Sequence, residues 1–289
     1  MLVGAAAVAV LGSTTLAAAA PQLSAQVLRK YTYVEGTVTV PANSDEMAVA
    51  TCPKGELPVG GGGYQNIQNT EEDINSSSPL YGYVGKTLWG YWTVDFNNNS
   101  SSTTVTGVAV AICAGKGSLT NYSQAEGNFV DVPANGHAQA TVTCPSGTVA
   151  LGGGWIDIGN GTGADYNLDE GASNSAPYGA NGWRSYQTAG SDGAKAAALV
   201  VCADEPTGWT QVSSSYVVNP ANTATAVTVN CPTGTKVLGG GAFNNSSSPL
   251  VNIGLTSSLS TLKGWETIEN NDSDASESVD AWAVCADVG

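Results

Sequence analysis

The strongest constraint in this sequence is a pattern that occurs three times. In each copy a Pro-Ala-Asn tripeptide is followed, eleven residues after its proline, by a Cys-Pro-x-Gly motif, and a run of glycines begins eight residues after that cysteine. The tripeptides begin at Pro41, Pro133 and Pro220, the motifs at Cys52, Cys144 and Cys231, and the glycine runs cover 60–63, 152–154 and 239–241. Because the spacing is the same in every copy, we expect three similar structural units.

Each copy continues with a Ser-rich stretch, a tryptophan that opens an alternating segment, and a Val- or Ala-rich segment that ends in Cys-Ala. The tryptophans are Trp92, Trp183 and Trp265, and the closing cysteines are Cys113, Cys202 and Cys285. Alternation of apolar and polar residues predicts β-strands, so we expect an all-β chain with about five antiparallel strands per repeat. The repeats span residues 31–115, 123–204 and 211–289. The Ser-rich stretch ends in Ser-Pro or Ala-Pro, at Pro79, Pro177 and Pro249, and its distance from the glycine run varies between copies, which predicts a loop there.

The composition supports this fold class and excludes some partners. Charged residues make up 11% of the 289 residues and 36 residues are glycine, which suits short strands joined by turns. The formal net charge is −15 at pH 7. Such a surface repels phosphate backbones and anionic lipid headgroups, so neither nucleic acid nor a membrane surface is an expected partner.

Residues 1–19 resemble a signal peptide, because the apolar run Leu2–Leu11 is followed by small residues at 17–20. The run is shorter than the roughly 20 residues that span a bilayer, so we expect cleavage after Ala19 rather than a membrane anchor. The mature chain is then secreted and extracellular, without a membrane span. The Ala-rich start and the low Lys content also resemble those of exported actinobacterial proteins.

The six cysteines are expected to form disulfides. Six cysteines allow fifteen complete pairings, but two of them stand at matching positions in each copy. An oxidising compartment outside the cell sustains such bridges. We therefore predict one bridge within each repeat, namely Cys52–Cys113, Cys144–Cys202 and Cys231–Cys285.

The glycine runs have two interpretations. A phosphate-binding loop requires a following helix, but here strand-like sequence follows each run. The favoured interpretation is that glycine lets a neighbouring strand or an aromatic ring approach the backbone closely, or permits a bulge. The three tryptophans are then expected to be buried against the glycine strand of their own repeat, whereas an exposed row of tryptophans would indicate a ligand platform.

The sequence offers little for catalysis. His137 is the only histidine, and the chain has neither a Gly-x-Ser-x-Gly motif nor a Cys-x-x-Cys pair. No catalytic residue, metal site or cofactor is therefore predicted. A carboxylate-based glycoside hydrolase remains an alternative. Its carboxylates would come from Asp95, Asp165, Asp169, Glu170, Glu266 and Glu269.

The repeated Cys-Pro-x-Gly motif, the glycine run and the closing cysteine resemble the repeat of the vitelline membrane outer layer proteins, although the copies here are longer and carry an in-phase tryptophan. That family folds as a β-prism with three Greek-key sheets around a pseudo-threefold axis. The resemblance implies such a prism and a structural or sugar-binding role, and it transfers no catalytic residue. The alternative architecture is three β-sandwiches in tandem. A prism is favoured because units of this size gain by sharing one core.

The leading functional prediction is a non-enzymatic binding module for a glycan or a cell-surface component, with a structural envelope or matrix protein as the alternative. Binding residues are expected between the glycine run and the tryptophan, where aromatic rings occur with hydrogen-bonding side chains. They are Tyr81, Tyr83 and Trp89 in the first repeat, and Asp165, Tyr166, Asp169 and Tyr178 in the second. The competing interpretation is that these aromatic residues only cover the ends of the sheets.

Overall fold

The computed structural model describes residues 26–66, 72–84, 87–159, 171–245, 253–261 and 263–289. The predicted signal peptide, residues 1–19, lies outside this part of the chain. The described residues form β-strands and one short 3₁₀ helix, η1 (Lys116–Ser118). The prediction of an all-β chain with antiparallel strands is confirmed.

Repeat 1 (residues 31–115) contains six described strands, and repeats 2 (123–204) and 3 (211–289) contain seven each. Repeat 1 has β1 (Thr32–Val40), β2 (Ser44–Thr51), β3 (Glu56–Gln65), β4 (Glu72–Val84), β5 (Thr87–Asn98) and β6 (Val105–Gly115). Repeat 2 has β7 (Ser123–Glu126), β8 (Val130–Val132), β9 (Gly136–Thr143), β10 (Val149–Gly159), β11 (Gly171–Pro177), β12 (Gly182–Ala189) and β13 (Ala194–Ala203). Repeat 3 has β14 (Thr210–Ser213), β15 (Val217–Asn219), β16 (Thr223–Asn230), β17 (Lys236–Asn244), β18 (Ile253–Ser260), β19 (Gly264–Asn271) and β20 (Glu277–Ala286).

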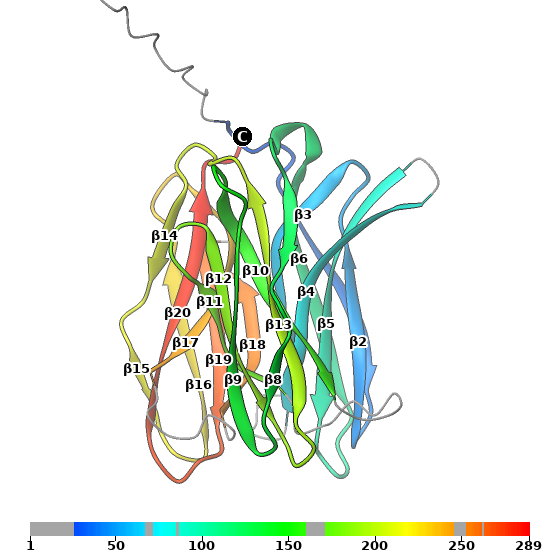
Figure 1. The fold of residues 1–289 in the computed structure, drawn as a ribbon, viewed down its shortest axis with the longest axis vertical. Coiled ribbons are helices and arrows are strands. Elements are labelled where there is room, and N and C mark those ends of the chain that lie inside the picture. Colours follow the sequence, from blue (N-terminus) through cyan, green and yellow to red (C-terminus); the bar gives the residue numbers. More distant parts are fainter. Residues whose placement is uncertain (1–25, 67–71, 85–86, 160–170, 246–252, 262) are drawn as a thin grey trace, which may run out of the picture.

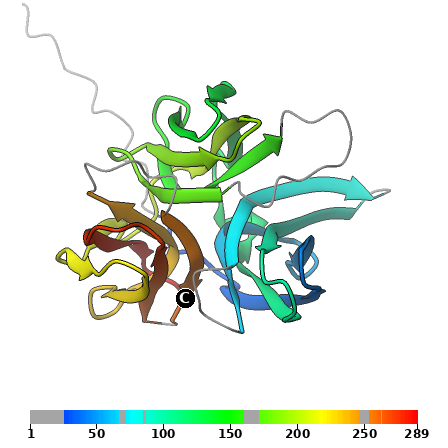
Figure 2. The same cartoon turned by 90° about the horizontal axis from the view of Figure 1, so that it is seen from below.

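The strands form three antiparallel sheets, and each sheet combines strands of two repeats (Figure 1). Sheet I has the order β1-β6-β3-β18-β19-β16. Sheet II has the order β2-β5-β4-β10-β13-β7 with β8 beside β13, and sheet III has the order β14-β20-β17-β11-β12-β9 with β15 beside β20. Viewed from the end, the strands lie around a common centre in three groups, coloured blue to cyan, green, and yellow to red (Figure 2).

The expected loop between the glycine run and Pro79 or Pro177 is wrong in part, because β4 and β11 are strands, and β18, after Pro249, is a further strand that the expected five per repeat did not include. Each of them pairs with the glycine strand of another repeat: β18 with β3, β4 with β10, and β11 with β17. Backbone hydrogen bonding between repeats therefore fixes a part of the chain that looks variable in sequence. The repeats are joined in a cycle, repeat 1 to 3, 2 to 1 and 3 to 2.

The two short motifs of each repeat form turns. The asparagines of the Pro-Ala-Asn tripeptides have positive φ angles, which are 51° at Asn43, 51° at Asn135 and 55° at Asn222. The glycines of the Cys-Pro-x-Gly motifs have φ angles of 84° at Gly55, 90° at Gly147 and 97° at Gly234. Glycine and asparagine adopt this left-handed backbone at low cost, so the repeated motifs mark the places where the chain reverses.

The first glycine of each run lies where the three repeats meet. A Cβ atom on Gly152 would lie 2.6 Å from the carbonyl oxygen of Val59 and 2.8 Å from Cα of Gly60. One on Gly239 would lie 2.7 Å from Cα of Gly152, and one on Gly60 would lie 2.7 Å from Cα of Gly239. These contacts close a ring, and no residue with a side chain fits into it without displacing backbone. The residues that precede the three glycines, Val59, Leu151 and Leu238, belong to one buried apolar cluster.

The second glycine of each run receives the tryptophan of its own repeat. The pairs are Gly61 with Trp92, Gly153 with Trp183 and Gly240 with Trp265. All three indole rings are fully buried, so the predicted burial against the glycine strand is confirmed. The indole N–H of Trp92 donates to Ser77 Oγ and that of Trp183 donates to Ser175 Oγ, each at 2.8 Å. The Ser-rich strand therefore satisfies the polar atom of the buried ring.

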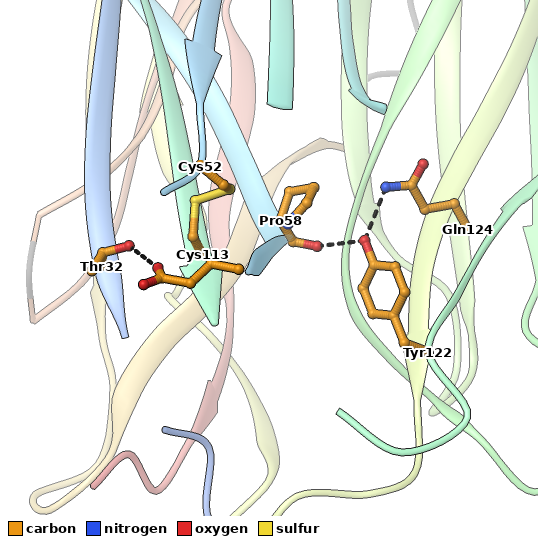
Figure 3. Close-up of a disulfide and its surroundings, with 7 residues drawn as sticks. Thr32, Cys52, Pro58, Cys113, Tyr122 and Gln124 are labelled. Atoms are coloured by element: carbon orange, nitrogen blue, oxygen red, sulfur yellow. Dashed lines mark hydrogen bonds between the residues drawn. A yellow bond between two sulfur atoms is a disulfide. The ribbon is translucent and has the colours of Figure 1, made fainter. Parts of the chain in front are cut away.

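A side chain at the start of each repeat, or one or two residues before it, hydrogen bonds to the next repeat of the cycle. Tyr31 Oη donates to the Val237 carbonyl at 2.8 Å, Tyr122 Oη donates to the Pro58 carbonyl at 2.8 Å, and Trp209 Nε1 donates to the Ala150 carbonyl at 3.0 Å. Each of these carbonyls stands where a β-bulge interrupts the register of the glycine strand. Figure 3 shows Tyr122 between the Pro58 carbonyl and the side chain of Gln124.

The three predicted disulfides are confirmed. Cys52–Cys113, Cys144–Cys202 and Cys231–Cys285 have Cα–Cα distances of 5.8, 5.7 and 5.8 Å and sequence separations of 61, 58 and 54 residues. The first lies close to the Tyr122–Pro58 contact (Figure 3). In the chain-entropy model a loop of this length stabilises the fold by about 4 kcal/mol per bridge.

Replacement of a central glycine tests the contact between repeats. The substitution Gly152→Ala places a methyl group against the backbone of Val59 and Gly60 in repeat 1. It should therefore lower the free energy of unfolding by about 2 kcal/mol or more. Gly117→Ala is the control, because a Cβ there meets no atom within 4 Å. Urea unfolding followed by tryptophan fluorescence gives both values. Equal stability of the two variants would contradict the central contact.

The hydrogen bond between Tyr122 and the Pro58 carbonyl (Figure 3) can be tested without creating a large cavity. The substitution Tyr122→Phe removes only the hydroxyl that donates to the Pro58 carbonyl. We expect a loss of about 1–2 kcal/mol in urea unfolding, because the half-buried contact leaves an acceptor without its donor. Tyr178→Phe, at an exposed ring, is the control and should change stability by less than about 0.5 kcal/mol. A neutral Tyr122→Phe variant would show that the contact adds nothing to the stability of the fold.

Candidate functional site

The described members of the predicted binding set lie at two places, Tyr81 and Trp89 on the β4–β5 hairpin of sheet II and Tyr178 beside sheet III. Asp165, Tyr166, Asp169 and the side chain of Tyr83 lie outside the described residues. Tyr81 in β4 is 45% exposed, and its ring packs edge-on against Tyr122 with centroids 5.9 Å apart. Trp89 in β5 is half-buried. Tyr178, which follows β11, is 49% exposed, and its ring centroid lies 5.6 Å from the guanidinium carbon of Arg184 on sheet III. A binding role for these residues stays a prediction.

The solvent-facing side of sheet III gathers aromatic and charged side chains. In β12 Trp183 and Ser185 are fully buried, so the alternate residues Arg184 and Tyr186 face the other side of the sheet. We name the group on this side the sheet III cluster. It comprises Tyr178, Arg184, Tyr186, Tyr216, Phe243, Asp280 and Trp282.

Strand register places the five cluster residues that lie in strands in two rows across β20, β17, β11, β12 and β9, which are neighbours in the sheet (Figure 1). Tyr178 and Tyr216 lie in the segments beside these strands. The first row contains Asp280, Phe243, Asn174, Tyr186 and Gln139. The second contains Trp282, Gly241, Ala176, Arg184 and Thr141. Because Gly241 and Ala176 are small, the Arg184 side chain can lie across the sheet toward β17.

Arg184 is stacked on aromatic rings. Its guanidinium carbon lies 3.7 Å from the ring centroid of Phe243 and 5.6 Å from that of Tyr178. Tyr186 packs edge-on against Phe243 with centroids 6.2 Å apart, and its hydroxyl donates to Gln139 Oε1 at 2.7 Å. A cation held against the face of a ring is stabilised by the ring quadrupole and loses side-chain freedom. The guanidinium is therefore positioned before any ligand arrives.

The charge of Arg184 has no direct carboxylate partner among the described residues. Among the described residues the ion pair is that of Lys195 Nζ with Asp131 Oδ1, which lie 2.5 Å apart on sheet II. The Nε atom of Arg184 is buried and has no hydrogen-bond partner there. The sheet III cluster thus holds a cation with unused donors in a protein of net charge −15.

Asp280 is the acidic member of the cluster. It is buried, and Trp282 Nε1 donates to its Oδ1 at 3.0 Å. Burial raises the pKa of Asp280 to about 6, opposed by this hydrogen bond, by the Phe243 backbone N–H and by the charge of Arg184. Burial also raises the pKa of Tyr216, which Asp280 raises further and Arg184 lowers. Asp280, Tyr216 and Arg184 therefore lie close enough to interact electrostatically.

Most of the cluster was not among the sequence-predicted residues, although the sequence holds the signals. Arg184 and Tyr186 alternate with the buried Trp183 and Ser185, so they must face away from the core. Phe243 follows the glycine run in the same way that Tyr64 and Ile156 do. What the sequence alone does not reveal is that β11 and β12 of repeat 2 lie beside β17 and β20 of repeat 3.

The described carboxylates of the hydrolase alternative do not converge. Asp95 lies in β5 of sheet II, and Glu266 and Glu269 lie on opposite faces of β19 in sheet I. Glu269 is fully buried, and Asn244 Nδ2 donates to both of its oxygens at 3.1 Å. The other residues of that alternative, Asp165, Asp169 and Glu170, lie outside the described residues.

A scan against protein-family models finds no match to the chain, and a search of curated proteins finds no similar sequence. In the described residues, no group of three or more His, Cys, Asp or Glu side chains is arranged to hold a metal ion. The same part of the chain contains no helix that is long and apolar enough to cross a membrane.

Three buried carboxyl groups predict that the protein is more stable in acid. Burial raises the pKa of Asp95 to about 7, with further contributions from Asp45 and Glu46, and it raises the pKa values of Asp280 and Glu269. An unfolded Asp has a pKa of about 3.9, so the folded state binds more protons. This stabilisation is complete below about pH 4 and is lost as the pH rises through 6 and 7. Urea unfolding should show the loss between pH 5 and pH 8.

The variant Asp95→Asn separates this effect from other titrations. It should be more stable than the wild type at pH 8 and should show a weaker decline from pH 5. Asp192→Asn, in an exposed turn, is the control and should leave the decline unchanged. A steep rise of stability with pH in the wild type would contradict the assignment.

Proposed function

We propose that this chain is a secreted, non-enzymatic protein that binds carbohydrate through the sheet III cluster. The observation that carries the proposal is the combination of exposed rings with fixed polar groups on one sheet face. Tyr178 and Tyr216 are 49% and 47% exposed. Arg184 lies beside Tyr178, Tyr216 interacts with Asp280, and Gln139 pairs with the neighbouring Tyr186. Sugar sites combine an aromatic face, which packs against the C–H side of the ring, with a few groups that hydrogen bond its hydroxyls.

Secretion is supported by the three disulfides and by the signal-like residues 1–19. We further infer a β-prism in which the three repeats are related by a pseudo-threefold axis. The support for the prism is the ring of central glycines, the cyclic exchange of strands and the three equivalent hydrogen bonds between repeats. The resemblance to the vitelline membrane outer layer repeat points to the same architecture.

A structural role in a cell envelope or matrix is the second candidate. It is favoured by one observation, the disulfide within every repeat combined with backbone contact between all three repeats. Such cross-linking resists unfolding outside the cell, but it does not account for exposed aromatic rings and a stacked cation on one face.

The test is a glycan array probed with the mature protein, followed by affinity measurements on two variants. Tyr178→Ala removes an exposed ring of the sheet III cluster and should weaken binding by tenfold or more. Tyr81→Ala is the matched control, because its ring is similarly exposed but lies outside the cluster. Loss of binding in Tyr81→Ala alone would place the site at the residues predicted in the first repeat, around Tyr81 and Trp89. An array without any bound glycan would favour the structural role.

A further inference from the structure

We propose that the sheet III cluster recognises a carboxylate-bearing saccharide, that Arg184 binds the carboxylate, and that Asp280 makes this binding stronger in acid. This inference rests on the proposed carbohydrate-binding function and assigns the class of sugar and its regulation.

The first step is the presentation of the guanidinium. Phe243 stacks on Arg184 at 3.7 Å, so one face of the planar group is occupied while its edge stays available. The N–H groups of that edge form a fork that matches the two oxygens of a carboxylate. The Nε atom is buried, so a ligand carboxylate would meet the two terminal nitrogens, Nη1 and Nη2, which also present a pair of parallel N–H donors. Arginine held in this way is poised for bidentate binding of a planar anion.

The second step is the selectivity that the charge provides. The protein carries 24 acidic and nine basic residues, so its overall field repels anions. Affinity for an acidic sugar must then come from local contacts, and Arg184 supplies the cation of the sheet III cluster. The residues at the same position in the other repeats, one after the buried tryptophan, are Thr93 and Glu266. The equivalent faces of sheets II and I therefore lack this cation.

The third step is the sugar ring that carries the carboxylate. Tyr178 lies 5.6 Å from the guanidinium carbon and is half exposed, so its ring can pack against a saccharide whose carboxylate reaches Arg184. On the other side of Arg184, Gln139 accepts the Tyr186 hydroxyl and leaves its amide N–H groups for sugar hydroxyls. A small carboxylate alone would use only the guanidinium, whereas a uronic acid uses the rings as well.

The fourth step is the effect of Asp280. The Asp280 carboxyl accepts hydrogen bonds from Trp282 on its own strand and from the Phe243 N–H of β17. It interacts electrostatically with Arg184 of β12 and with Tyr216, which lies between β14 and β15, and more remotely with the buried Glu269 of β19. As a carboxylate, Asp280 competes with a ligand anion for the field of Arg184. Its pKa of about 6 means that it becomes neutral as the pH falls from 7 to 5. A sugar carboxylate, similar to an α-carboxyl group with a pKa of about 3.5, stays ionised over that range.

The experiment compares acidic saccharides with neutral counterparts. The probes are oligosaccharides of galacturonate, glucuronate and mannuronate, each paired with its carboxyl-reduced form, and the method is calorimetric titration at pH 5.5 and pH 7.5. We expect at least one acidic probe to bind tenfold or more tightly than its reduced form at pH 5.5. Arg184→Gln should abolish that preference, and Lys195→Gln, which removes the same charge from an exposed position on sheet II, should keep it.

The pH arm tests Asp280 separately. Wild-type affinity for the acidic probe should fall several-fold from pH 5.5 to pH 7.5, whereas Asp280→Asn should bind equally at both values and as tightly as the wild type in acid. Thermal melts establish that each variant is folded. Equal binding of acidic and reduced probes would overturn the assignment of the carboxylate while leaving carbohydrate binding intact. Binding of no probe, together with an empty glycan array, would overturn both proposals. An unchanged pH response in Asp280→Asn would overturn the role of Asp280.

Discussion

The contact between backbones at the centre of the molecule is the constraint from which the other features follow. Gly60, Gly152 and Gly239 touch one another without side chains between them, so the three glycine strands approach as closely as main chain allows. At these three positions the close approach leaves no space for a side chain, and the tryptophan of each repeat packs against the next glycine of the run. A buried indole needs a hydrogen-bond acceptor, and Ser77 and Ser175 supply it from the strands that were expected to be loops.

Because each glycine strand continues its sheet with a strand of another repeat, every solvent-facing surface near the centre is shared by two repeats. The sheet III cluster shows the consequence. Arg184 and Tyr178 come from repeat 2, and Phe243, Tyr216 and Asp280 come from repeat 3. Neither repeat holds the stacked cation alone, so the site exists only when the repeats are assembled. The hydrogen bond from Trp209, just before repeat 3, to the Ala150 carbonyl of repeat 2 is a further link between the same two repeats.

The sequence predicts the features that are local and recur in every repeat, but it does not predict which strands pair between repeats. The alternation after Trp183 and the pairing of Cys144 with Cys202 follow from patterns within one repeat, and the structure confirms them. The pairing of β11 with β17 depends on which repeat lies next to which, and no local pattern encodes that. Variation in length after the glycine runs predicts loops, but β4 and β11 follow those runs as strands. Backbone hydrogen bonds hold these strands, and such bonds place little demand on side-chain identity. Arg184 and Phe243, 59 positions apart, could therefore not be joined into one site by reading the chain.

The three sheets also explain why a repeated fold need not have a repeated site. The buried glycines and tryptophans are fixed by packing in all three repeats, whereas the outward-facing positions beside them are free to differ. Sheet III pairs Phe243 with Arg184, sheet I pairs Tyr64 with Glu266, and sheet II pairs Ile156 with Thr93 at the corresponding positions. In sheet I the Tyr64 hydroxyl also interacts with Glu35, so that face is aromatic but acidic. If the sheet III cluster binds an acidic sugar as proposed, such a ligand would be attracted to the first of these faces and repelled by the second, and it would meet neither a ring nor a charge at the corresponding positions of the third. Under this proposal the outward-facing residues beside the shared core, and not the core itself, decide which face can hold an acidic ligand.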